Sequence, residues 1–112
     1  IIGCCFKVHN QLGPGLNENI YKNSLKLEFE KLFLKFALEK RYPVEYDGNK
    51  VGHLQLDLVV EDKVVVEVKA VTGMLPKLFE SQLLSYLKVA KIKVCLLVNF
   101  GNKTCYIKRY VA

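Results

Sequence analysis

Apolar residues recur at two different spacings along this chain, and each spacing predicts a different kind of element. Residues 1–12 place apolar side chains three and four positions apart, which is typical of a helix, and Gly13-Pro14-Gly15 ends it. A second helix is expected from Asn17, a good capping residue, to about Lys31. A third is expected over residues 77–90. Its inward-facing residues are predicted to be Leu83, Leu84, Leu87 and Val89.

Alternation of apolar and polar positions predicts strands in the remaining segments. The predicted strands are residues 32–38, 51–60, 64–70, 93–99 and 104–110. Pro43 is expected to bend or end the first strand, and Asp47-Gly48-Asn49 is a turn before the second. The order is helix, helix, three strands, helix and two strands. This order predicts an α/β (α+β) fold with a mixed sheet, in a single domain over residues 1–112.

The hairpin formed by the second and third strands carries charged residues on one face. Its even positions are apolar, whereas Asp57, Glu67 and Lys69 occupy odd positions. A three-residue loop at 61–63 then places Asp57 directly opposite Glu67. By the same register, Gln55 falls opposite Lys69. We therefore predict that the two carboxylates lie close together on the same face as the lysine.

Two facing carboxylates need a compensating partner. At about 5 Å they repel by roughly 3 kcal/mol with an effective dielectric constant of about 20. A bound divalent cation would turn this repulsion into ligation, and two carboxylates with a carbonyl and waters suit magnesium. The alternative is that these side chains are only the solvated face of a half-exposed hairpin.

The net charge of +6 is unevenly distributed along the sequence. All 11 acidic residues lie at or before Glu80. The charged residues after Glu80 are all basic: Lys88, Lys91, Lys93, Lys103, Lys108 and Arg109. This asymmetry predicts that one end of the fold binds a polyanion, unless these residues form only a solvated surface.

The cysteines and histidines suggest structural roles. The four cysteines form no CxxC pair and two are adjacent, which disfavours a four-ligand zinc site or an iron–sulfur cluster. We expect buried, reduced thiols at Cys4, Cys5, Cys95 and Cys105. His9 lies on an apolar helix face and is expected to be a packing residue, whereas His53 could approach a phosphate from the polar strand face.

The sequence contains no membrane-spanning or targeting pattern. No apolar run approaches the roughly 18 residues that a bilayer requires, and the N-terminal segment has neither a charged region nor a small-residue cleavage site. We therefore expect a cytoplasmic protein with no membrane association.

Several blocks of the sequence resemble one known family. Gly15-Leu16-Asn17-Glu18-Asn19-Ile20-Tyr21 fits the GxxExxY signature of a group of small proteins in the PD-(D/E)XK nuclease superfamily. The further blocks, in order, are Val8-His9 with Leu12-Gly13-Pro14-Gly15, the Asp57 strand ending in Val60-Glu61-Asp62-Lys63, Glu67-Val68-Lys69-Ala70-Val71, Gln82-Leu83-Leu84-Ser85-Tyr86-Leu87 and Leu97-Val98-Asn99-Phe100. The resemblance covers nearly the whole chain. It implies a restriction-endonuclease-like core, in which helices flank a mixed central sheet.

The resemblance also implies an active site. Its residues would be Glu18, Asp57, Glu67, Lys69 and Gln82. Asp57 and Glu67, with the backbone carbonyl of Val68, would hold Mg²⁺, for which Mn²⁺ can substitute. Glu18 would hold a second metal or a metal-bound water, Lys69 would orient or deprotonate the attacking water, and Gln82 would orient the ensemble. Glu18 is otherwise a favourable anion at a helix N-terminus, and Gln82 a solvated helix residue.

One departure from the family concerns Gln55, which stands where relatives commonly have arginine. We therefore expect altered substrate contacts near the metal. Because all five site residues are present, we predict a metal-dependent nuclease that hydrolyses nucleic-acid phosphodiesters, with DNA favoured over RNA. Two alternatives remain open: a non-catalytic nucleic-acid-binding module that keeps the fold, and a protein-interaction domain. A core of 112 residues without substrate-recognition additions would depend on a protein partner or on homodimer formation.

Overall fold

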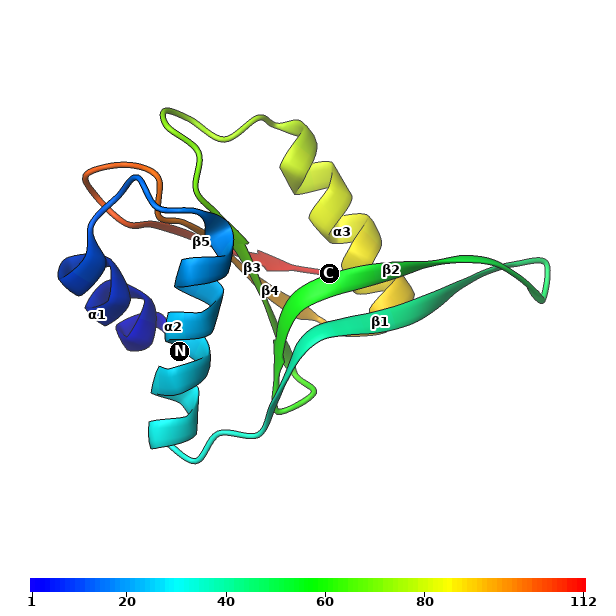
Figure 1. The fold of residues 1–112 in the computed structure, drawn as a ribbon. Coiled ribbons are helices and arrows are strands. Elements are labelled where there is room, and N and C mark those ends of the chain that lie inside the picture. The colour runs from blue at the N-terminus through cyan, green and yellow to red at the C-terminus, as the bar shows by residue number, and fades with distance from the viewer.

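The computed structural model describes residues 1–112 and confirms the predicted order of elements (Figure 1). The helices are α1 (Ile2–Leu12), α2 (Glu18–Lys31) and α3 (Leu78–Ala90). The strands are β1 (Phe36–Tyr46), β2 (Asn49–Val60), β3 (Val64–Lys69), β4 (Val94–Asn99) and β5 (Tyr106–Val111). As expected, the side chain of Asn17 caps α2 by accepting a hydrogen bond from the Ile20 N–H at 3.2 Å. No helix is long and apolar enough to cross a membrane.

The five strands form one mixed sheet in the order β1-β2-β3-β4-β5. Neighbouring strands are antiparallel except for β3 and β4, which are parallel. A parallel pair needs a crossover connection, and α3 supplies it. In Figure 1, α1 and α2 cover one face of the sheet and α3 covers the other. The β1–β2 hairpin extends beyond this body at one side.

Each face of the sheet has its own apolar core. The face covered by α1 and α2 holds 14 buried residues and the face covered by α3 holds 9, so the first core is the larger. Strand β3 shows how the faces are separated: Val66 and Val68 point toward α1 and α2, whereas Val65 points toward α3. Because the sheet is covered on both faces, its central strands are rich in Val and Leu.

The first strand differs from the prediction. It begins at Phe36, after a turn in which Phe33 has a φ of 57° and is 95% exposed, so the alternation seen from residue 32 did not mark the start of a strand. Pro43 does not end the strand but lies within it, paired with His53. This is possible because β1 is an edge strand, where a residue without an N–H need not break a ladder.

The predicted inner face of α3 is only partly correct. Leu83 and Leu87 are buried, but Leu84 is largely exposed and Val89 is half-buried. The reason is that residues four apart share the centre of a helix face, whereas Leu84 points toward one side of it.

The expected packing roles of the cysteines and of His9 are confirmed. All four cysteines are buried and free, and burial is the main cause that raises the pKa of the Cys5 thiol to about 12. His9 is buried, with its Nε2 atom 2.8 Å from the Asn102 carbonyl oxygen and its ring stacked on Phe100. His9 therefore ties α1 to the loop between β4 and β5.

Candidate active site

The hydrogen-bond ladder between β2 and β3 stops where the two carboxylates begin. The paired residues run from Val60–Val64 to Leu58–Val66, which confirms the predicted register. The ladder itself ends one residue before Asp57 and Glu67, so these two residues face each other across an opening and not as a ladder pair. Their side chains complete the bonding instead. The Asp57 N–H donates to Glu67 Oε1 at 3.0 Å, and the Val68 N–H donates to Asp57 Oδ2 at 2.8 Å. Each carboxylate thus accepts a hydrogen bond from a backbone N–H of the opposite strand. The two strands can therefore diverge here without leaving these N–H groups unpaired.

The side chains of β2 also exchange sheet faces at Asp57. Leu58 packs under α1 and α2, but Leu56 packs under α3, although both even positions were expected on one face. The β1–β2 ladder also has no pair between Glu39 and Asp57, and Glu39 has a φ of 55°. The alternation of faces therefore breaks at Asp57. This places its carboxylate in a gap of the sheet that is accessible from both layers.

A cavity of about 200 Å³ lies over this gap on the α3 face. Its walls are Gln55, Asp57, Glu67, Lys69, Phe79, Gln82, Leu83, Tyr86 and Leu97. Four of the five predicted active-site residues are therefore in one place, together with Gln55. Glu18 is not among the walls; it is half-buried in the first turn of α2. His53 is exposed on β2 and also lies outside this cavity.

Glu67 has an unusual electrostatic environment. It is only 5% exposed, and burial followed by the charge of Asp57 raises its pKa to about 8. Lys69 partly offsets this effect, but its ammonium lies over the Phe79 ring, 4.7 Å from the ring centroid. A buried carboxylate next to a second carboxylate is an arrangement that a cation would stabilise.

Lys22 on α2 was not predicted to belong to the site. It is 8% exposed, and its Nζ atom lies 3.4 Å from Asp57 Oδ1 and 3.4 Å from Glu39 Oε1. Burial alone would lower the pKa of Lys22, but the two carboxylates outweigh burial and raise it. Lys22 lies one turn after Glu18, between the buried residues Tyr21 and Leu25. The sequence offered one indication of this contact, which is that Lys22 stands between two apolar residues expected in the core, Tyr21 and Leu25.

The tyrosine of the GxxExxY block has a structural role. The Tyr21 hydroxyl donates to the Gly13 carbonyl at 2.6 Å and accepts from the Leu16 N–H at 3.2 Å. Its ring stacks on Phe100 with a centroid distance of 4.4 Å. These contacts fix the loop before α2 and hence the position from which Lys22 reaches Asp57.

Two asparagines fix the loop that leads from β3 to α3. Asn99 both donates to and accepts from the backbone of Val71, at 2.9 Å each, and Asn102 does the same with Gly73. Gly101 is required here because a Cβ atom would lie 2.4 Å from the Val71 backbone. The loop is thus held against the β4–β5 connection, which sets where α3 and Gln82 begin.

The donor atoms at the gap fit a divalent cation that prefers oxygen. The cavity holds two carboxylates, and no cluster of three or more potential side-chain ligands is present. Because the N–H and C=O of one strand residue point to the same side, the Val68 carbonyl faces β2, where the ladder has ended. Two carboxylates and one carbonyl leave room for several waters, which is the coordination that Mg²⁺ favours.

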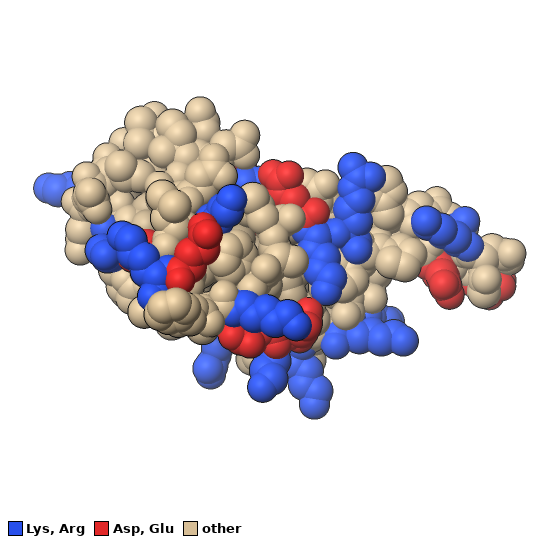
Figure 2. All heavy atoms as spheres, turned by 60° about the horizontal axis from the view of Figure 1, so that its bottom comes forward, with Lys and Arg blue, Asp and Glu red and all other residues tan.

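The six basic residues after Glu80 are all exposed but do not gather at one end of the fold. Lys91 and Lys93 precede β4 whereas Lys103 follows it, so they lie at opposite ends of that strand. Figure 2 shows one face on which Lys and Arg side chains are interspersed with Asp and Glu. The prediction of a single basic end is wrong, because an antiparallel β4–β5 pair returns the chain along its own length.

The mixed sheet thus opens between β2 and β3 around two carboxylates, with Lys69 beside them. The sequence model of the PD-(D/E)XK nuclease superfamily matches residues 1–110, and the chain belongs to that superfamily. A solved structure titled "Crystal structure of SSO0001" is similar with a TM-score of 0.66 at 19% identity, over 83% of this chain and 48% of that one. This similarity shows the fold alone, and the chain spans about half the length of that protein. No curated protein sequence matches the chain.

Proposed function

We propose that this protein is a metal-dependent nuclease that hydrolyses phosphodiester bonds, with DNA favoured over RNA as its substrate. The observation that carries the proposal is the opening between β2 and β3. There, Asp57 and Glu67 each bond to the opposite strand and line one cavity with Lys69 and Gln82. Membership of a nuclease superfamily supports this assignment.

Asp57, Glu67 and the Val68 carbonyl would hold Mg²⁺ or Mn²⁺ in this proposal. Such a cation, when bound, polarises a phosphate and lowers the pKa of a water. The ligand set leaves out Glu18, because it does not line the cavity. Lys22 of α2 supplies a positive charge beside Asp57.

Lys69 and Gln82 would act on the substrate side. The Lys69 ammonium, now over Phe79, projects from the same face as Glu67 and would orient the attacking water and stabilise negative charge on the phosphate. Gln82 is exposed, lines the cavity and would position the phosphate or the water. Gln55, which lines the same cavity, would contribute a neutral contact there.

One observation favours a second function, that of a nucleic-acid-binding module without catalysis. Lys22 already pairs with Asp57, so this carboxylate is neutralised without any metal ion. The exposed lysines of the C-terminal third would then bind phosphates in the absence of cleavage.

A cleavage assay separates the two functions. Labelled single-stranded DNA, double-stranded DNA and RNA would be incubated with the wild type in Mg²⁺, Mn²⁺ or EDTA. We expect cleavage that depends on metal and is lost in Asp57→Asn. It should persist in Asp62→Asn, which alters an exposed carboxylate paired with Lys40. If the wild type binds these substrates but cleaves none of them with either metal, the binding module replaces the nuclease.

A further inference from the structure

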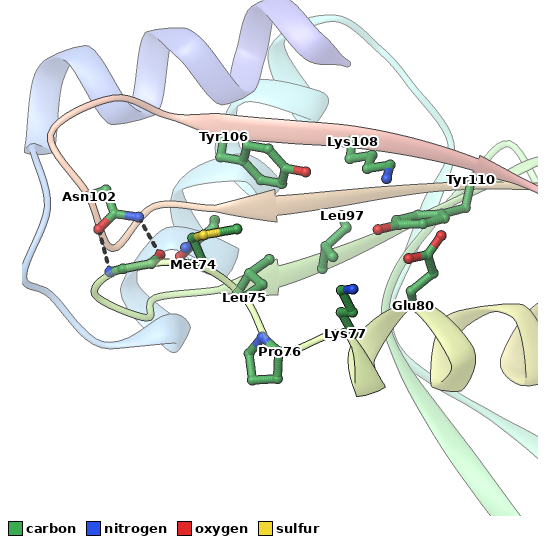
Figure 3. Close-up of a pocket in the computed structure, with 12 residues that line it drawn as sticks. Met74, Leu75, Pro76, Lys77, Glu80, Leu97, Asn102, Tyr106, Lys108 and Tyr110 are labelled. Carbon is green, nitrogen blue, oxygen red and sulfur yellow. Dashed lines mark hydrogen bonds between the residues drawn. The ribbon is translucent and has the colours of Figure 1, made fainter.

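A second and larger cavity lies on the same face of the sheet. Its volume is about 440 Å³, which is within the range of about 300–1,000 Å³ typical of small-molecule sites. Figure 3 shows it between β5, the loop after β3 and the start of α3. Its apolar and aromatic walls are Met74, Leu75, Pro76, Leu97, Tyr106 and Tyr110. Nothing in the proposed cleavage chemistry uses this cavity.

The two cavities are neighbours because Leu97 lines both of them. The strand register explains why. Across the sheet, Glu67 pairs with Leu97, which pairs with Lys108. In the next row, Lys69 pairs with Asn99, which pairs with Tyr106. Two strand spacings amount to about 10 Å, so β5 presents its side chains within a nucleotide or two of the carboxylates.

Two of the lining residues expose surfaces that suit a flat ring. Tyr106 on β5 is 47% exposed, and Met74 on the facing loop is 94% exposed. Both side chains line the cavity, Tyr106 from β5 and Met74 from the loop after β3 (Figure 3). Aromatic rings stack on nucleobases whatever their identity, and a methionine thioether packs well against a ring.

The charges at the cavity favour an anionic ligand. Lys77 and Lys108 line it against a single acid, Glu80. The Lys108 ammonium lies over the Tyr110 ring at 5.3 Å from its centroid, at the inner end of the same strand face. A flat ring joined to a negative group is the chemistry of a nucleotide, and the cavity combines aromatic walls with an excess of positive charge.

The loop that forms one wall is already held in place. Asn99 and Asn102 bind the backbone of Val71 and Gly73, so Met74 and Leu75 follow directly after an anchored segment. A preformed wall reduces the ordering cost of binding.

We infer that this cavity is a base pocket. It binds one unpaired nucleobase of the substrate strand, a nucleotide or two from the phosphate at Asp57 and Glu67. The identity of the strand rests on the proposed nuclease function. Because a base inside a duplex is stacked and paired, the pocket selects single-stranded or locally opened nucleic acid.

Binding without cleavage tests the inference. A short fluorescein-labelled oligothymidylate would be titrated in EDTA, by fluorescence anisotropy, into wild type, Tyr106→Ala and Tyr106→Phe. Tyr46→Ala is the matched control, because Tyr46 is also exposed but lies at the far end of β1. We expect Tyr106→Ala to weaken binding by roughly 10- to 100-fold, with the phenylalanine variant and the control close to wild type. A strand of the same length made of abasic sites should bind wild type and Tyr106→Ala equally.

The two proposals fail in different ways. If wild type cleaves nothing, but Tyr106→Ala selectively loses binding of the strand that carries bases, the base pocket stands and the nuclease proposal falls. If Tyr106→Ala binds oligothymidylate as wild type does, the base pocket is overturned whatever the cleavage result. Wild type that binds both strands equally overturns it as well. Should Tyr106→Ala fail to fold by circular dichroism, Met74→Ala replaces it, since Met74 also lines the cavity and is nearly fully exposed, so its truncation leaves the core intact.

Discussion

The two faces of the sheet are built from the same strands but differ in what they leave open. Two helices close the first face over 14 buried residues, among them Tyr21, Leu25 and Phe29 of α2. A single helix, α3, covers the second face over 9 buried residues and leaves a cavity on each side. One face therefore supplies most of the apolar burial that stabilises the fold, and the other is free to hold polar groups and ligands.

Asp57 is the point at which the two faces meet. Its carboxylate contacts Lys22 from the layer of α2 and lines the cavity beneath α3. The proposed catalytic group is therefore held by the well-packed side and works on the open side. Variants on the two faces should accordingly have separable effects.

The largest effect is expected at Lys69. Lys69→Ala should lower the cleavage rate by roughly 10²- to 10⁴-fold, because it removes the group proposed to orient the attacking water. Metal affinity should stay the same or tighten, since a nearby positive charge is removed. Asp57→Asn should instead weaken metal binding and cleavage together. Single-turnover cleavage and calorimetric metal titration would measure both quantities, with Lys63→Ala in the exposed loop as control. A folded Lys69→Ala protein that cleaves at the wild-type rate would remove the lysine from the mechanism.

Truncating a core side chain on the face covered by α1 and α2 should lower the free energy of unfolding. Leu25→Ala removes a fully buried side chain of α2 and should lower the free energy of unfolding by about 2–5 kcal/mol. Leu84→Ala on the exposed side of α3 should change it by only about 0.5 kcal/mol or less. Urea denaturation followed by circular dichroism measures both. Equal losses would show that the two faces are packed alike.

On the open face, ionisation of Glu67 should lower the free energy of unfolding. Its folded-state pKa is about 8, above the ordinary value of 4.5, so the folded protein keeps a proton that the unfolded chain releases. Stability without metal should therefore fall as the pH rises between these values. Glu67→Gln cannot ionise and should be more stable than wild type by about 1–3 kcal/mol above pH ~8, with little difference below pH ~4.5. Thermal melts in EDTA across this range test the sign, and a wild type more stable than the variant at high pH contradicts it.

The smallest effect is expected for the exposed lysines. Changing Lys88, Lys91 and Lys93 to Gln should flatten the salt dependence of single-strand binding by about 0.7 in slope for each phosphate that a lysine no longer neutralises. Lys103→Gln, at the other end of β4, provides the comparison. If the triple variant keeps both its affinity and its salt slope, the nucleic acid runs elsewhere on the surface.

Several features of the site could be predicted because they depend on local pattern. The register of the β2–β3 hairpin follows from a three-residue loop and the alternation of Val and Leu, and it brought Asp57 and Glu67 into one cavity with Lys69. Gln82 followed from the resemblance. Lys22 could not be found in this way, because its contact with Asp57 joins residues 35 positions apart through the packing of α2.

The order of elements, the hairpin register and the burial of the cysteines could be predicted from the sequence alone. Each depends on the periodicity of neighbouring side chains and on the burial of apolar ones. The assembled fold decided the rest. It opened the ladder at Asp57, brought Lys22 into the gap, left Glu18 outside the cavity and carried the basic residues to different places. It also brought Tyr106 and Met74 to the walls of one cavity. These outcomes depend on how helices and strands distant in sequence pack against one another, and no local spacing of residues encodes that packing.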